Sequence, residues 1–395
     1  MIRRALASLV LCLILLCAGI YVGAHPNGLP GFIRDPLVGD SDTRIMGEAI
    51  DTIHNTYYRE YSKDDLSNRA IGGAVRSLND RFSNYFDPES YRAFKLNQNG
   101  QFAGIGVEVI KDPDGLKIAK VYDNSPASGA KLRPGDVITG VGTSSLHGRS
   151  SDASIALIQG RLGTDVKITV RRGRDTRTVT LTRSNIDVPV VASAEKTVDG
   201  KKLGIIVLSQ FSSGAHAEVA AALQRQLRDR VKGLVFDLRG NPGGLVTEAQ
   251  LVASEFLKDG KIVTTKGRSV PTRTLDATGD AIAPTLPMVV LVDRNSASAA
   301  EIVSGALQDR KRAELVGTRT FGKGVFQEVI DLSNGGALDI TAGQYFLPSG
   351  RNLGGKGTDT GSGLTPDVKA QDNPKTTNKD EGLDKALDVI AAKAS

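Results

Sequence analysis

The sequence predicts a mixed α/β core that is preceded by a compact β-rich module and by a helical segment. Three patterns lead to this prediction: apolar residues recur at helical spacing before Gly100, short β-like runs separated by turns follow it, and strands alternate with helices from about Ile186. Such alternation is typical of a buried sheet covered by helices. The expected regions are a leader at 1–24, a helical segment at 40–96, the β-rich module at 97–185, the core at 186–370, and a polar linker with a C-terminal helix at 371–395.

The leader is predicted to direct export. Arg3 and Arg4 precede the uncharged stretch from Ala5 to Ala24, which has the basic start, apolar middle and small final residues of a signal peptide. Twenty residues also span about 30 Å as a helix, so a retained membrane anchor is the alternative. Both place most of the chain in the periplasm or another extracytoplasmic space.

Composition excludes several kinds of site. Both cysteines, Cys12 and Cys17, lie in the leader, which excludes a disulfide framework, a thiolate zinc site and a cysteine nucleophile from the rest of the chain. The net charge of +6 is compatible with an anionic partner, but no dense run of Lys and Arg occurs. We therefore expect a solvated basic surface and no nucleic-acid partner. We also expect no cofactor and no metal.

The helical segment is interpreted as a small cap or dimerisation arm, and a homo-oligomer is expected. A turn is predicted at Asn84–Pro88. The apolar residues at helical spacing are Ile45, Ala49, Ile50, Ile53 and Tyr57, then Leu66, Ala70, Ile71 and Ala74.

Within the two folded regions the pattern predicts individual elements. The β-rich module has expected strands at Gly106–Ile110, Leu116–Val121, Asp136–Val141, Val166–Arg171 and Thr178–Thr182, and a helix at Ser151–Gln159. The core has expected strands at Leu203–Leu208, Leu234–Leu238, Met288–Val292, Ala313–Val316 and Val325–Ile330, and helices at Ala215–Arg230, Leu245–Leu257 and Ala297–Asp309. A last helix is expected at Glu381–Ala392.

Ser298 is the first candidate for chemistry. It lies between an apolar strand and a helix, where its hydroxyl is exposed and the free N–H groups of the helix N-terminus face an oxyanion. Glu301 follows three residues later, so a capping box is the structural alternative. This segment alone does not distinguish the two.

Lys323 is the second candidate, because it stands between two glycines. The stretch from Gly317 is close to a phosphate-binding P-loop, but Gly324 occupies the position of the magnesium-binding Ser or Thr, and a strand rather than a helix follows. As a catalytic base Lys323 needs a pKa lowered from about 10.4 to about 7–8, which only a desolvated pocket provides. A nucleotide-binding site is kept as the weaker alternative.

The third candidate is the loop at 237–244, D-L-R-G-N-P-G-G, which follows a strand and precedes a helix. Its last two glycines allow backbone N–H groups to point at a ligand, as an oxyanion hole requires. A tight turn between strand and helix explains the loop equally well.

Together these segments resemble the carboxyl-terminal processing proteases, also called tail-specific proteases. The motifs are specific because they occur together and in order, over roughly residues 40–367, with Ser298 and Lys323 25 positions apart as in that family. The matching stretches are D-L-R-G-N-P-G-G at 237–244, N-S-A-S-A-A-E-I at 295–302, G-T-R-T-F-G-K-G-V-F-Q at 317–327, T-A-G-Q-Y-F-L-P-S-G-R at 341–351 and L-T-P-D at 364–367.

The resemblance implies an α/β (α+β) protease core and a serine endopeptidase that cleaves exported proteins near their C-termini through an acyl-enzyme. Ser296 is then a neighbour of the nucleophile and ranks second for that role. The assigned residues are Ser298 as nucleophile, Lys323 as general base, Gln327 as the residue that orients the lysine, and Gly244 and Ala299 as the backbone N–H donors of the oxyanion hole.

The β-rich module is similar to the PDZ domain that this family carries. Phe102–Val107 matches its carboxylate-binding loop, and Leu132–Asp136 matches a later turn. N–H groups of a glycine-rich loop capture a terminal carboxylate while the peptide adds as a strand to the sheet edge. A hairpin turn without a ligand is the alternative. The residues expected to bind the C-terminal tails of protein substrates, with or without an adaptor protein, are Gly104, Ile105, Gly106 and Val107.

Two other functions remain open. A Ser-His-Asp hydrolase needs a catalytic histidine, and no histidine lies in a turn-rich catalytic context. A zinc protease is also disfavoured, because no histidine pairs with Glu at the spacing of a zinc site. An exported PDZ adaptor with an inactive core is the non-enzymatic alternative, against which the intact Ser298, Lys323 and Gln327 argue. The four histidines are His25, His54, His147 and His216.

Overall fold

The computed structural model describes residues 41–373, 376 and 379–394. The chain divides into two units, Met1–Ser77 and Leu78–Ser395, which are described separately. The predicted leader at 1–24 lies outside the described residues. Among those that are described, no helix is both long enough and apolar enough to cross a membrane.

In the first unit, the expected helical pattern is confirmed as α3 (Ser41–Thr56) and α4 (Lys63–Arg76). The Ser62 hydroxyl caps α4 by accepting a hydrogen bond from the Asp65 N–H at 3.0 Å. The large apolar side chains of this unit that remain exposed are Ile45, Met46, Ile53, Tyr57 and Tyr58.

The second unit begins with a short strand where the sequence predicted a turn. Strand β1 (Asn84–Phe86) pairs antiparallel with β18 (Ala337–Phe346), so a partner far away in sequence makes the segment extended. Helix α5 (Pro88–Gln98) follows at once, with Asp87 as its cap and proline in its first turn. The expected turn at Asn84–Pro88 was therefore wrong, because local composition carries no information about the pairing partner.

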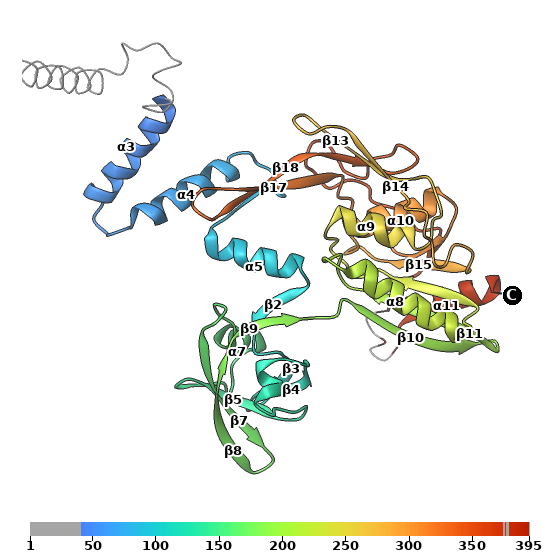
Figure 1. Ribbon diagram of the computed structural model, residues 1–395, viewed down its shortest axis with the longest axis horizontal. Helices are drawn as coiled ribbons and strands as arrows, with labels where there is room; N and C mark the ends of the chain where they lie inside the picture. Colours follow the sequence, from blue (N-terminus) through green and yellow to red (C-terminus); the bar gives the residue numbers. More distant parts are fainter. Residues whose placement is uncertain (1–40, 374–375, 377–378, 395) are drawn as a thin grey trace, which may run out of the picture. The chain divides into compact units, whose positions relative to one another are not determined.

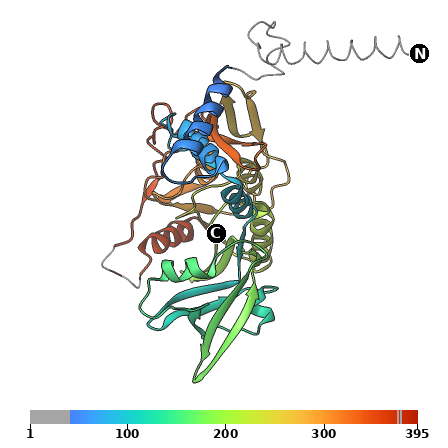
Figure 2. The same cartoon turned by 90° about the vertical axis from the view of Figure 1, so that its left-hand side faces the viewer.

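The β-rich module has the predicted strands and helix, with small shifts at their ends. Its main sheet has the order β3-β4-β5-β7-β8, with β6 beside β5, and a separate pair joins β2 to β9. Strands β7 and β8 form a long hairpin, drawn in green in Figure 2. The elements are β2 (Gln101–Gly104), β3 (Val107–Asp112), β4 (Gly115–Val121), α6 (Pro126–Gly129), β5 (Val137–Val141), β6 (Ser144–Ser145), α7 (Ser151–Ile158), β7 (Asp165–Arg172), β8 (Asp175–Thr182) and β9 (Ser184–Asp187).

The core is built on a six-stranded sheet with the order β10-β11-β12-β15-β16-β19. Of these strands, β10, β11 and β15 are labelled in Figure 1. Strand β10 is antiparallel to β11, and the other neighbours are parallel. The strands are β10 (Val191–Val198), β11 (Lys201–Leu208), β12 (Gly233–Asp237), β15 (Met288–Val292), β16 (Glu314–Gly317) and β19 (Val368–Lys369).

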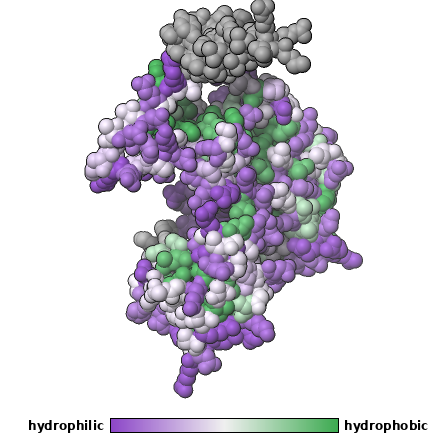
Figure 3. Space-filling view, turned by 60° about the vertical axis from the view of Figure 1, so that its left-hand side comes forward, coloured by the Kyte–Doolittle hydropathy of each residue, from purple (hydrophilic) through white to green (hydrophobic). Residues whose placement is uncertain are grey.

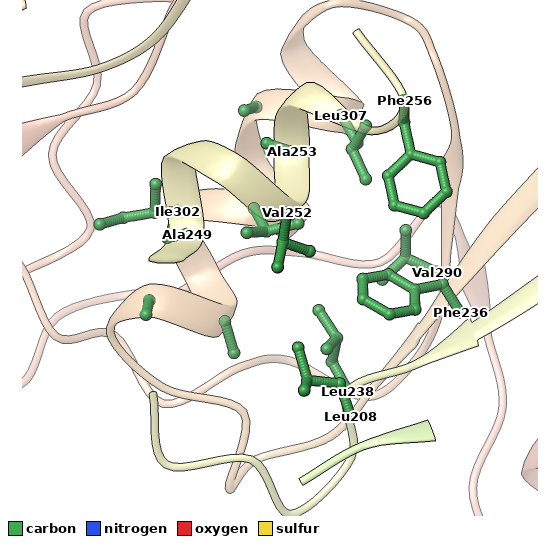
Figure 4. Close-up of a cluster of buried hydrophobic side chains, with 14 of the residues drawn as sticks. Leu208, Phe236, Leu238, Ala249, Val252, Ala253, Phe256, Val290, Ile302 and Leu307 are labelled. Carbon is green, nitrogen blue, oxygen red and sulfur yellow. The ribbon is translucent and has the colours of Figure 1, made fainter. Parts of the chain in front are cut away.

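Alternation of side chains along these strands creates two apolar layers. Phe236 and Val290 join a cluster with α8 (Ala215–Arg228), α9 (Val246–Ser254) and α10 (Ala299–Asp309), part of which is shown in Figure 4. Val235 and Val289, one residue earlier, belong to a second cluster with α11 (Glu381–Lys393). The C-terminal helix, whose packing the sequence left open, therefore covers the other face of the sheet.

A second sheet of the core brings distant segments together. Its order is β1-β18-β13-β14, and β17 also pairs with β18. Strands β13 (Lys261–Gly267), β14 (Arg273–Asp276) and β18 were not predicted, whereas β17 (Val325–Asp331) was. On the face drawn in Figure 3, apolar residues form separate patches among polar ones, which is typical of a surface in contact with water.

Candidate active site

The three segments with candidate residues follow neighbouring parallel strands. The loop at 237–244 follows β12, Ser298 follows β15, and the lysine loop follows β16. Because β12, β15 and β16 are adjacent and parallel, their carboxyl ends open at the same edge of the sheet, the usual place for a ligand in an open α/β sheet. The fold thus brings together segments that are up to 86 positions apart in the sequence.

Ser298 occupies a strained turn directly before α10. Its φ of 54° lies in the left-handed region that side chains other than glycine rarely adopt, and such strain is concentrated at functional sites. The side chain is half-buried. Ser296 differs, because it is fully buried, donates to the Leu238 carbonyl at 2.8 Å and accepts from the Asp293 N–H at 2.9 Å. The Ser296 hydroxyl is thus part of the loop structure.

The glycine loop packs directly against the Ser298 turn. A Cβ on Gly243 would lie 2.8 Å from the Cβ of Ser298 and 2.9 Å from the Ala299 nitrogen, and its φ is +102°, so only glycine fits. Within the described residues, neither the Gly244 nor the Ala299 N–H has a hydrogen-bond acceptor. The Asn241 carbonyl accepts from Ala297 at 2.9 Å and fastens the two loops together.

Lys323 is held in a largely dry environment. Its Nζ donates to Gln327 Oε1 at 2.6 Å and lies 5.0 Å from the ring centroid of Phe82. Burial lowers the pKa of Lys323, and the charges of Asp339, Asp80 and Glu301 oppose this effect. Among the described residues, no hydrogen bond joins Lys323 Nζ to the Ser298 hydroxyl.

The central residue that the sequence analysis missed is Glu301. It is fully buried, and its Oε2 accepts from the Ser298 and Lys323 N–H groups at 3.0 Å each. Its Oε1 accepts from the Thr320 hydroxyl at 2.6 Å and the Gly322 N–H at 2.7 Å. Burial raises the pKa of Glu301, while these donors oppose the rise. The capping-box spacing was visible in the sequence, but the contacts across to the lysine loop were not.

The same contacts argue against a phosphate site at the lysine loop. In a P-loop the backbone N–H groups face a phosphate, whereas here those of Gly322 and Lys323 face the Glu301 carboxylate. A strand, β17, follows the loop in place of a helix. Within the described part of the chain, no cluster of three or more His, Cys, Asp or Glu side chains could hold a metal ion.

Arg239 joins the glycine loop to the C-terminal helix. Its guanidinium donates to Asp237, at 2.8 Å for the shortest bond, and makes two bonds of 2.8 Å to Asp380, the N-cap of α11. Burial lowers the pKa of Arg239, but the hydrogen bonds that its guanidinium donates to both carboxylates outweigh burial and raise it. The conformation of the loop therefore depends on a helix that lies beyond the predicted core boundary at 370.

In the β-rich module, the proposed carboxylate loop is tightly fixed. The Ile105 carbonyl accepts from Ala127 and the Gly106 carbonyl from Tyr122, and the Ile105 side chain is 2% exposed. Gly106 has a φ of +81°, and a Cβ there would lie 2.1 Å from the Cβ of Ser125. Gly106 is thus required by local packing.

The histidines in the described residues lie outside these loops. The Nδ1 of His216 is 2.9 Å from Glu248 Oε2, and Glu248 also accepts from the Gly214 and His216 N–H groups. His147 is exposed near Asp114. The fourth, His25, lies outside the described residues. Among the residues described, therefore, no histidine lies on the loops that carry Ser298 and Lys323.

The fold and the site define a serine peptidase with a PDZ domain. The family model described as peptidase family S41 matches residues 202–370, and the PDZ domain model matches 103–182. A relative from Staphylococcus aureus (strain bovine RF122 / ET3-1), described as "Probable CtpA-like serine protease", is 32% identical over 369 residues, which cover 93% of this chain and 71% of the relative. The chain belongs to this family of carboxyl-terminal processing proteases.

Two further comparisons agree with this assignment. A relative with the same description from Staphylococcus haemolyticus (strain JCSC1435) is 31% identical, over 91% of this chain and 71% of its own length. The solved structure of the photosystem II D1 C-terminal processing protease is 28% identical, with a TM-score of 0.50, and the match covers 89% of this chain and 97% of that structure. The α/β core, the inserted PDZ domain and the peptidase class are thereby confirmed.

Proposed function

We propose that the protein is an endopeptidase that cleaves exported proteins near their C-termini, with Ser298 as nucleophile and Lys323 as general base. The observation that carries the proposal is Glu301, whose single carboxylate binds the backbone of both residues. A buried carboxylate shared in this way fixes the positions of the nucleophile and the base relative to each other. Such preorganisation is what a two-residue catalytic unit requires.

The chemistry follows from the environment of each group. Burial lowers the pKa of Lys323, which increases the fraction of neutral amine that can take the Ser298 proton when Nζ and Oγ come within hydrogen-bond distance. Oγ attacks the peptide carbonyl, and the free N–H groups of Gly244 and Ala299 stabilise the oxyanion. The protonated lysine then gives its proton to the leaving amine, and water hydrolyses the acyl-enzyme in the reverse sequence of proton transfers.

The PDZ domain is proposed to select substrates by their C-terminal tails. The loop at 104–107 leads directly into β3, an edge strand of the main PDZ sheet. A peptide that adds to such an edge places its terminal carboxylate at the preceding loop. The same proposal includes export through the leader, attachment to the membrane by it, an adaptor protein and a homo-oligomer.

Digestion of an unfolded model protein tests the proposed activity. The chain without residues 1–24 and its Ser298→Ala variant are incubated with the substrate, and the products are mapped by mass spectrometry. We expect cleavage near the C-terminus by the first protein only. No turnover by either protein would favour the PDZ adaptor with an inactive core, and equal turnover by both would reject Ser298 as the nucleophile.

A further inference from the structure

A chain of side chains leads from the candidate base into the loop at 80–83. Lys323 Nζ donates to Gln327 Oε1 at 2.6 Å, and Gln327 Nε2 donates to the Thr341 hydroxyl at 3.1 Å. The Thr341 N–H donates to the Ser83 hydroxyl at 3.0 Å, and that hydroxyl donates to Asp80 Oδ2 at 2.5 Å. The network therefore connects β17 and β18 with a loop more than 240 positions earlier in the sequence.

The direction of these bonds determines which end of the Gln327 amide faces the lysine. A lysine ammonium only donates, so it needs the amide oxygen, and the NH₂ group must then find an acceptor elsewhere. The Thr341 hydroxyl is that acceptor. Its own proton remains available to the nearby Asp80 carboxylate. Burial raises the pKa of Asp80, but hydrogen bonds from Ser83, Thr341 and Phe82 outweigh burial and lower it.

The loop itself is rigidly placed. Asp80 Oδ1 accepts from the Phe82 N–H at 2.9 Å, and Oδ2 accepts from Ser83. Ser83 is 7% exposed, so these hydrogen bonds are protected from water. The same turn puts the Phe82 ring over Lys323 Nζ.

We propose that Thr341 is a positioning residue, whose hydroxyl, held by the loop at 80–83, fixes the Gln327 amide with its oxygen toward Lys323. This inference rests on the proposed role of Lys323 as base. With the amide fixed, an N–H of neutral Lys323 is bound by Gln327 and the nitrogen lone pair is free for the Ser298 proton. A reversed amide donates to that lone pair instead and removes the basic site.

Two substitutions separate the hydroxyl from the shape of Thr341. Thr341→Val keeps the shape and removes the hydroxyl, whereas Thr341→Ser keeps the hydroxyl. We expect Thr341→Val to lower kcat about tenfold with KM little changed, as the loss of one hydrogen bond implies, and Thr341→Ser to retain wild-type kcat. Thr264→Val is the matched control, since Thr264 pairs with Thr274 in the same sheet and outside the network.

A double-mutant cycle tests whether Thr341 acts through Gln327. In a Gln327→Ala background, Thr341→Val should have no further effect on kcat, because residues in one network are not additive. Three outcomes would each overturn the proposal. They are a wild-type kcat in Thr341→Val, equal losses of kcat in the Val and Ser variants, and independent effects of Thr341 and Gln327 on kcat. If Thr341→Val does not fold, Asp80→Asn replaces it, and wild-type kcat in that variant would overturn the proposal.

A measurement without turnover separates this inference from the proposed function. In Ser298→Ala protein with ¹³Cε-labelled lysine, the Lys323 signal is assigned by its loss in Lys323→Arg and titrated with pH. Because an amide oxygen favours the ammonium form, Thr341→Val should lower the measured pKa of Lys323, and Thr341→Ser should leave it unchanged. An unchanged pKa in the Val variant rejects the positioning role even if the enzyme proves to cleave peptides. A lowered pKa of Lys323 in the Val variant supports the positioning role even if the protein does not cleave peptides.

Discussion

The carboxylate of Glu301 accepts a hydrogen bond from the backbone N–H of Lys323 at 3.0 Å. The same oxygen accepts from the Ser298 N–H at 3.0 Å, so one buried side chain joins the loops of the proposed nucleophile and base. Any change in this carboxylate should therefore affect stability and activity together.

Ser298→Ala and Lys323→Ala should each abolish cleavage of an unfolded model protein. The two residues act as one unit, so the double variant should be no less active than either single one. His216→Ala is the control and should remain active, because His216 lies on α8, pairs with Glu248 of α9 and is on neither of the loops that carry Ser298 and Lys323. An inactive His216→Ala beside an active Lys323→Ala would instead identify a histidine base.

Glu301→Gln should destabilise the protein and remove activity. The amide puts an NH₂ donor among four donors that need an acceptor, and each buried donor left unpaired costs about 1–3 kcal/mol. We expect a decrease of about 2 kcal/mol or more in the free energy of unfolding, measured with urea in a Ser298→Ala background. Glu328 is exposed on β17, so Glu328→Gln should change neither stability nor activity. A stable, active Glu301→Gln would refute the role given to Glu301.

The pH profile should show a basic group that must lose its proton. Activity should fall as the pH falls through the pKa of Lys323, which burial places below its usual value. Asp339 favours the ammonium form, so Asp339→Asn should lower that pKa and shift the acidic limb of kcat/KM to lower pH. Asp331→Asn, on β17 and bound to Tyr91, should not shift it. A shift to higher pH in Asp339→Asn would contradict the assignment.

Amidation of a substrate's C-terminus should weaken its recognition by roughly tenfold or more. The amide removes the charge that strengthens a hydrogen bond to backbone N–H groups and places a donor against them, a combined loss of about 1.4 kcal/mol or more, which is tenfold. Cleavage rates of free-acid and amidated substrates measure the effect in the intact chain. Deletion of residues 101–183 then distinguishes two roles of the PDZ domain. If the shortened protein still cleaves, the PDZ domain restrains the core; if it does not cleave, the PDZ domain delivers substrate. Equal rates for the two substrates in the intact chain would reject carboxylate recognition.

The C-terminal helix should contribute to the stability of the core. Asp380 accepts two bonds of 2.8 Å from Arg239 and caps α11 through the Leu383 N–H at 2.7 Å. Asp380→Ala should therefore lower the free energy of unfolding by about 1–2 kcal/mol. Asp372 contacts Arg239 at 3.5 Å, so Asp372→Ala should cost less. The opposite order in urea denaturation would show that Arg239 does not fasten the helix.

The sequence by itself determined the class of fold, most core elements and the peptidase family. Local signals were sufficient for these: the apolar strand Met288–Val292 was predicted with the bounds that the structure has, and the three motifs keep their order and spacing. Ser298 and Lys323 could be proposed as catalytic candidates from the sequence alone, because each lies in a motif that is recognisable without knowledge of its partners.

Only the tertiary structure decided what surrounds those residues. Strand β1 is extended because it pairs with β18, and α11 has a fixed place because Arg239 and the sheet bind it. Glu301 and Thr341 reach Lys323 through hydrogen bonds that cross from one loop or strand to another. Such contacts depend on how the chain folds back on itself, and residues that are distant in sequence carry no local pattern that reveals them.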